Sequence, residues 1–221
     1  DMLGYYLRLA FSSFRRTPGL TALMVLAIAA GISVCVMSLT LYQAISGNPI
    51  WWKSHDLYTI TIDSWSPERP VNDKDPDELP PQLTYPDAKN LFLSDIPKRK
   101  VMMFRSGGIV SGGVDPQGRR TEALQTLTRV TTADFFAMFD VPFRHGNGWK
   151  AAADNAPEPV IVLSKELNEK VFGGVNSVGR TLRWKDHEFR VVGVLDEWQP
   201  QPKFYDLNNG AFEPPEGAYI P

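Results

Sequence analysis

Three histidines and one cysteine are the side chains of this 221-residue chain most suited to bind a transition metal. His55, His145 and His187 lie far apart in the sequence, and Cys35 lies within an apolar stretch. Zinc sites are typically built from Cys and His pairs only a few residues apart, and no such spacing occurs here. The lone cysteine also excludes an intrachain disulfide. We therefore expect no metal site in this chain.

Patterns typical of a catalytic or cofactor site are also absent from the sequence. There is no Gly-x-x-x-x-Gly-Lys-Ser/Thr loop to bind the phosphates of ATP. The Ser106-Gly-Gly and Ser111-Gly-Gly runs are typical of turns, and neither shows the base and orienting acid that a catalytic serine needs. The acidic run 63–81 lacks the glycine turn and the final glutamate of a calcium loop. We predict that the chain is not an enzyme and binds no cofactor itself.

Charge and hydropathy narrow the class of protein further. The 23 basic and 25 acidic residues give a net charge of −2, and no concentrated basic face suggests a nucleic-acid partner. No charged residue occurs from Thr17 to Trp52. Because about 20 apolar residues cross the hydrocarbon core of a bilayer, we predict a transmembrane helix over 19–46. This helix needs membrane lipid around it.

Two alternatives to a membrane span are less consistent with this apolar segment. Helices buried in soluble proteins rarely stay apolar on every face for so long. The apolar region of a secretory signal peptide covers only about 7–15 residues, and bulky Val34 disfavours lipid modification at Cys35. A span that stays in the mature protein is the better interpretation.

The flanks of the span predict its orientation. Arg15 and Arg16 precede it, and cytoplasmic flanks carry excess Lys and Arg, so we place the N-terminus in the cytoplasm. Apolar residues at helical spacing over 1–18 predict an amphipathic helix on the inner membrane surface. Trp51 and Trp52 are candidates for the opposite interface, although this pair could equally cap the core of the outer domain.

Small residues recur along one face of the predicted span. Ala27, Gly31 and Cys35 are four residues apart, so they share a helix face on which another helix could pack closely. Chance is an equal explanation, because Ala and Gly are common in membrane helices.

Residues 47–221 combine strand-like and helix-like segments without regular βαβ alternation, which predicts an α+β domain, here expected to have two lobes. Periodicity predicts strands at 57–62, 101–104, 109–114, 122–130, 159–163, 179–184 and 188–195 and helices at 84–93, 132–139 and 165–172. The same spacing predicts a core of Val160, Val162, Leu167, Val171, Phe172, Leu182, Phe189, Val191 and Val194.

A set of C-terminal segments carries a family resemblance. They are Arg129-Val-Thr-Thr-Ala-Asp-Phe-Phe-Ala-Met-Phe-Asp-Val-Pro-Phe143, Pro159-Val-Ile-Val-Leu-Ser-Lys-Glu-Leu167, Val171-Phe-Gly-Gly174, Val178-Gly-Arg-Thr-Leu182 and Phe189-Arg-Val-Val-Gly-Val-Leu195. In this order and spacing they resemble the periplasmic core domain of MacB-like ABC-transporter permeases. The preceding basic helix and span also resemble that family.

The resemblance implies a permease subunit in the bacterial inner membrane, with its main domain in the periplasm. It implies an ABC exporter in which a separate cytoplasmic ATPase hydrolyses ATP and drives efflux of a drug, peptide or lipoprotein. The partners would be that ATPase, a second permease copy or homologue, and in some systems a periplasmic adaptor. By the same resemblance, the domain would be incomplete at its C-terminus, before three further spans.

A second function remains open at this stage. The same fold could serve as a membrane-anchored periplasmic sensor or adaptor that controls a periplasmic partner, as in the cell-division branch of this superfamily.

Overall fold

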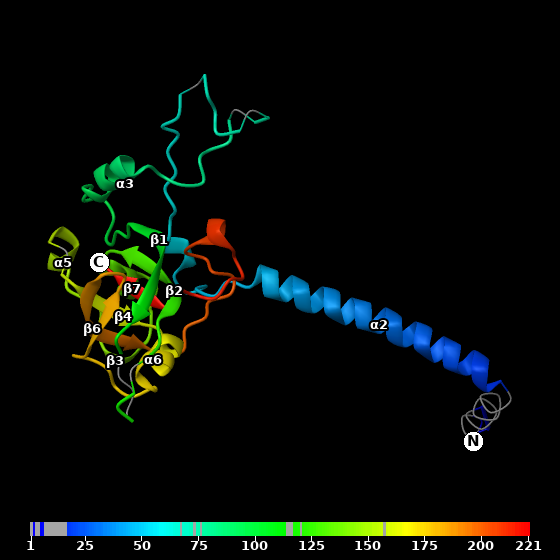
Figure 1. Cartoon of the computed structure of the whole chain (residues 1–221). Coiled ribbons are helices and arrows are strands. Elements are labelled where there is room, and N and C mark those ends of the chain that lie inside the picture. The colour runs from blue at the N-terminus through cyan, green and yellow to red at the C-terminus, as the bar shows by residue number, and fades with distance from the viewer. Residues whose placement is uncertain are drawn as a thin grey trace. The chain divides into compact units, whose positions relative to one another are not determined.

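The computed structural model describes residues 2, 5–6, 17–66, 68–72, 74–75, 77–113, 117–119, 121–156 and 158–221. The chain divides into two units, 1–48 and 49–221, whose elements are drawn in Figure 1. Most of the amphipathic helix predicted over 1–18, including Arg15 and Arg16, lies outside the described residues.

The first unit is dominated by α2, a 29-residue helix from Pro18 to Ser46. At a rise of 1.5 Å per residue it is about 43 Å long, more than the roughly 30 Å of a bilayer core. The hydroxyls of Thr21, Ser33 and Thr40 donate to carbonyls four residues earlier, so these polar groups are satisfied within the helix. Its length and composition suit a membrane span, and the predicted apolar helix is confirmed.

A seven-stranded sheet forms the centre of the second unit, in the order β3-β6-β4-β7-β2-β1-β5. β5 pairs with β1 and also with β6, so the pairing of all strands except β3 closes into a circuit. Two pairs, β4–β6 and β2–β7, are parallel and the others are antiparallel. The strands are β1 Met103–Ser111, β2 Leu124–Thr131, β3 Phe143–Gly146, β4 Val160–Leu163, β5 Thr181–Trp184, β6 His187–Leu195 and β7 Ala218–Ile220.

Helices and core clusters cover the two faces of this sheet. Successive residues of a strand point to opposite faces, and accordingly Val160 and Val162 belong to one core cluster while Ile161 and Leu163 belong to the other. The first cluster includes residues of α4 and α5 and is rich in aromatic rings; the second includes residues of α6. The helices are α3 Tyr85–Phe92, α4 Asp134–Met138, α5 Ala152–Asn155 and α6 Lys165–Phe172, with short 3-10 turns at Ser54–Asp56 and Leu207–Asn209.

The predicted α+β class and most of the predicted core are confirmed. Eight of the nine predicted core side chains are buried, and Phe189 is partly buried. Residues 49–221 form one compact unit with a core cluster on each face of one sheet, rather than two lobes. The expected division into two lobes is therefore corrected: this unit has a single sheet with one core cluster on each of its faces.

Four predicted details are wrong. Residues 57–62 alternate as a strand would, but they pair with no strand in the part of the chain described. The segment around Ser106-Gly-Gly108 continues one strand, β1, instead of turning between two. The cap of α4 is Ala133 instead of a threonine; its backbone N–H donates to Asp154, 2.9 Å away. The short strands β3 and β7 were not expected at all.

One glycine of β1 is required by the closure of the sheet. The indole N–H of Trp184, on β5, donates to Oγ1 of Thr128, on β2, at 3.0 Å. The indole ring passes so close to Gly108 that a Cβ there would lie 2.2 Å from Trp184 Nε1. The neighbouring Gly107 has open space around the same position.

We expect Gly108→Ala to lower the free energy of unfolding by about 1–3 kcal/mol, because Trp184 must move to admit the methyl group. Gly107→Ala is the matched control and should change stability by no more than about 0.5 kcal/mol. Thermal unfolding of both variants measures the difference. Equal stability of the two variants would show that Trp184 moves aside freely.

Candidate functional site

The segment that follows α2 is attached, within the second unit, to the C-terminal end of α4. Ile50 is 3 % exposed and belongs to the aromatic core cluster. Lys53 Nζ donates to the carbonyl oxygens of Ala137 and Met138 at 3.1 and 3.4 Å. The last carbonyls of a helix have no partner within it, and a lysine is a favourable partner for them.

Asp140 completes this attachment. Its Oδ1 lies 2.5 Å from Lys53 Nζ, and its Oδ2 accepts from Trp52 Nε1 at 2.9 Å. Its backbone has a φ of 50°, a left-handed conformation that aspartate adopts more readily than most residues other than glycine and asparagine. We call Ile50, Trp52, Lys53 and Asp140 the junction anchor.

Electrostatics make the junction anchor sensitive to acid. Hydrogen bonds from Lys53 and from Trp52 lower the pKa of Asp140 below its ordinary value. A carboxyl whose pKa is lowered by folding stabilises the fold above its ordinary pKa, and this contribution is lost as the pH falls through the lowered value. The anchor is therefore fully formed at neutral pH.

The two tryptophans predicted at the membrane interface lie in different surroundings. Trp52 is half-exposed and hydrogen-bonded to Asp140, whereas Trp51 is 72 % exposed and touches Trp52 edge-on at 5.9 Å. Trp52 is thus hydrogen-bonded to Asp140 just after α4, but neither tryptophan belongs to a core cluster, so the interpretation that the pair caps the core stays a prediction. An interfacial position for Trp51 stays a prediction.

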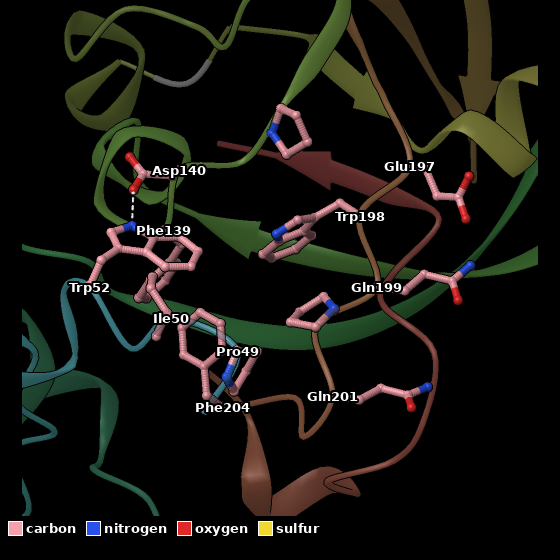
Figure 2. Close-up of a pocket in the computed structure, with 12 residues that line it drawn as sticks. Pro49, Ile50, Trp52, Phe139, Asp140, Glu197, Trp198, Gln199, Gln201 and Phe204 are labelled. Carbon is pink, nitrogen blue, oxygen red and sulfur yellow. Dashed lines mark hydrogen bonds between the residues drawn. The ribbon is translucent and has the colours of Figure 1, made fainter. Parts of the chain in front are cut away.

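A cleft of about 520 Å³ opens beside the junction anchor. Figure 2 shows Trp198 in the middle of its lining, with Trp52, Phe139 and Phe204 on one side. The lining consists of Pro49, Ile50, Trp52, Phe139, Asp140, Pro142, Glu197, Trp198, Gln199, Pro200, Gln201 and Phe204. Ligand sites typically have volumes of roughly 300–1,000 Å³, and this cleft lies within that range.

One wall of the cleft is the segment 197–201, which we call the strap. Glu197 is bridged to Lys165 at 3.3 Å, and Gln199 donates to Glu166 at 3.1 Å, so two side chains of the strap are tethered to α6. Trp198 stacks on Tyr205 with ring centroids 5.2 Å apart and an interplanar angle of 13°. These contacts fix the orientation of the Trp198 ring.

Tyr205, on which Trp198 stacks, also contacts a buried ion cluster of four charged side chains: Arg129, Lys203, Asp206 and Glu216. Arg129 bonds both carboxylates, and Lys203 bonds Glu216 at 3.0 Å. Two positive charges balance two negative ones, as burial of ions requires. The cluster connects β2 to the segment between the strap and β7.

The pKa values around the buried ion cluster follow from burial and pairing. Burial acts to raise the pKa of Asp206, but hydrogen bonds from Arg129 and Asn209 outweigh it and lower that pKa. Burial raises the pKa of Tyr205, whose hydroxyl donates to Glu216 at 3.1 Å. Both tyrosines of this region, Tyr205 and the fully buried Tyr219, are neutral at any physiological pH, since burial also raises the pKa of Tyr219.

Three other predicted site residues are not among those that line the cleft. Ala27, Gly31 and Cys35 are on α2, whose described side chains are all at least partly exposed in this single chain, so their helix-packing role is not tested. Within the described ranges, no group of three His, Cys, Asp or Glu side chains could hold a metal ion. No local pattern predicts that Lys53 and Asp140 form an ion pair, because their contact spans more than eighty residues of sequence.

Comparison with known proteins identifies one family and a few structural relatives. Residues 21–221 match the family described as the MacB-like periplasmic core domain. No curated protein matches the chain.

Two solved structures resemble the chain at low identity. The extracellular domain of the noncanonic ABC-type transporter YknZ from Gram-positive bacteria is 16 % identical, with a TM-score of 0.45 over 63 % of this chain and 62 % of that one. The periplasmic region of MacB from Actinobacillus actinomycetemcomitans is 17 % identical, with a TM-score of 0.46 over 69 % of this chain and 61 % of that one. The present chain thus spans about three fifths of either.

Proposed function

The chain belongs to the MacB-like periplasmic core domain family, and from this premise we propose that it is the permease subunit of an ABC exporter of the mechanotransmission type. The observation that carries the proposal is the family match, which runs from α2 to the last residue of the chain. The apolar helix supports a membrane-anchored protein.

In this proposal the energy comes from another subunit. A separate ABC ATPase in the cytoplasm hydrolyses ATP, and its motion reaches the membrane helices of the permease. The basic residues Arg15 and Arg16 support an N-terminus in the cytoplasm and, with it, a main domain in the periplasm of a bacterial inner membrane. A second permease copy or homologue completes the pair, and a periplasmic adaptor serves in some systems. The cargo is a drug, peptide or lipoprotein.

The junction anchor suits the transmission of force. Ile50, Trp52 and Lys53 follow α2 within a few residues, and each contacts the outer domain by burial, hydrogen bond or ion pair. Movement of this segment would act directly on the end of α4. Phe135 and Phe136, which belong to α4, are packed in the aromatic core cluster. A displacement of the end of α4 would therefore be transmitted to the core.

We expect Asp140→Ala in the complete transporter to reduce export by up to about five-fold. The change removes the acceptor shared by Trp52 and Lys53, and a net loss of about 1 kcal/mol corresponds to about a five-fold shift toward the undocked junction. Export is measured in cells or in reconstituted vesicles. The basal ATP hydrolysis of the partner subunit should remain, because the chain proposed here is not the ATPase.

Asp56→Ala is the matched control, since the exposed Asp56 carboxylate lies 3.3 Å from an exposed histidine and away from α4. Export by this variant should equal that of the wild type. Unchanged export from Asp140→Ala would reject the role of the anchor. Purification of the full-length protein without any ATPase would instead reject the transporter and favour the sensor or adaptor.

A further inference from the structure

The walls of the cleft beside the junction anchor are built from flat rings. Four aromatic side chains and three prolines contribute to the lining, and Figure 2 shows the rings of Trp52 and Phe139 on one side of Trp198. Phe139 and Pro200 are buried, whereas Trp198 and Phe204 are half-buried. Such walls favour a ligand with rigid apolar surfaces of matching size.

Charge does not select the ligand of this cleft. The two carboxylates of the lining are each paired: Asp140 with Lys53 and Glu197 with Lys165. Within the described residues, the lining includes no lysine, arginine or histidine. A strongly charged ligand would therefore find no unpaired counter-charge here.

The lining presents the indole N–H of Trp198 to a ligand. The indole N–H of Trp198 donates to no protein group among the residues described, although its ring is half-buried and held by stacking on Tyr205. A second ring, Phe135, touches it edge-on at 6.0 Å. Because a tryptophan in such a position gains from a hydrogen-bond acceptor, the cleft suits an apolar ligand that carries an exposed carbonyl oxygen.

We propose that this cleft binds a proline-rich segment of a partner protein in the polyproline II conformation. That conformation makes no internal hydrogen bonds, so its carbonyl oxygens are free to accept from the Trp198 indole. Its pyrrolidine rings pack on aromatic walls, and its rigidity keeps the entropic cost of binding low. Open, aromatic-lined grooves are how such segments are recognised.

Several features of the cleft fit this ligand better than a compact organic molecule. The backbone N–H groups of Trp198 and Gln201, both on the strap, donate to no other group within the described part of the chain. An extended peptide lying along the strap can use these donors too. The proposal concerns recognition of a partner, and it stands whether or not the chain is a permease.

The test is binding of fluorescein-labelled decaproline to the full chain in lipid nanodiscs, followed by fluorescence anisotropy. Saturable binding is expected, and a labelled Gly-Ser peptide of equal length should bind more weakly. Trp198→Phe keeps an aromatic ring but removes the N–H, and should weaken binding by about five-fold. Trp65→Phe is the matched control, since Trp65 is exposed and lies outside the lining, and should bind as the wild type does.

If the Trp198→Phe variant does not fold, a second measurement on the wild-type chain tests the proposal. In the wild-type chain the indole ¹⁵N–¹H resonance of Trp198 should shift on addition of decaproline, and that of Trp65 should not. Absence of saturable binding, equal binding of the Gly-Ser peptide, or an unmoved Trp198 resonance would each overturn the proposal. So would a folded Trp198→Phe variant with wild-type affinity.

Discussion

Replacing Glu216 with glutamine is expected to lower the free energy of unfolding of the outer domain by about 3–5 kcal/mol. Glu216 is fully buried and accepts from Arg129, from Lys203 at 3.0 Å and from Tyr205 at 3.1 Å. Glutamine has nearly the same shape, so packing is preserved while the charge and one of the two acceptor oxygens are lost. Arg129 and Lys203 would then share the single remaining carboxylate, Asp206.

Glu213→Gln supplies the matched comparison. Glu213 pairs with Arg105 at 2.8 Å, but its side chain is half-exposed, and exposed ion pairs contribute about 1 kcal/mol or less. Thermal and urea unfolding, followed by near-UV circular dichroism of the full chain in detergent, measure both variants. Equal losses in the two variants would mean that water reaches the buried ion cluster.

The Glu216 change should also affect the pairing of β7 in the sheet. The segment 203–216 leads directly into β7, which lies between β2 and β4 in the sheet. Arg129 is in β2, opposite Tyr219 of β7 in the register. The buried ion cluster therefore holds the incoming segment against the strand with which β7 pairs, and weakening it should loosen the centre of the sheet rather than an edge.

Local signals in the sequence predict the elements whose structure depends on near neighbours. Ser164 caps α6 by accepting from the backbone of Leu167, and Gly173 ends that helix with a φ of 68°, as a serine and a glycine in these places indicate. The hairpin of β5 and β6 forms about Lys185 as its alternating pattern predicts. β4 is a continuous apolar run and is buried on both faces.

Features that depend on distant contacts could not be predicted in this way. Residues 57–62 have the alternation of a strand, but alternation says nothing about whether a neighbouring strand is present to pair with them. β7 has only three residues, too few to show a period, and pairs with strands far away in the sequence. Arg129 meets its buried carboxylates across 77 and 87 residues.

In the candidate site, too, the sequence shows local features but not the contacts between distant residues. The tryptophan pair after α2 is a visible signal, but it does not predict the bond from Trp52 to Asp140. Asp140 itself follows a short helix in an ordinary-looking sequence, and only its positive φ and its two donors mark it. The strap carries one visible signal, a tryptophan among prolines and glutamines, but its cleft depends on residues from three separate segments.

Phe135→Ala is expected to lower the free energy of unfolding by about 3–5 kcal/mol, because it opens a cavity at the centre of the aromatic cluster. Phe135 is fully buried, and periodicity did not place it in the predicted core, since α4 is only five residues long. Its ring centroid lies within 6.0 Å of five others: Phe136, Phe139, Trp198, Tyr205 and Tyr219.

The same cavity should affect both parts of the candidate site, because Phe139 and Trp198 line the cleft and both pack on Phe135. Phe212→Ala is the control, since Phe212 is half-exposed and belongs to neither core cluster, and it should cost less than about 1 kcal/mol. Thermal unfolding measures stability, and hydrogen exchange of the Trp52 indole N–H reports on the anchor. Faster exchange is expected in Phe135→Ala alone, because a loosened α4 releases the carboxylate of Asp140 to which that N–H donates. A loss below about 1 kcal/mol with unchanged exchange would show that the neighbouring rings close the cavity and that the anchor does not depend on the core.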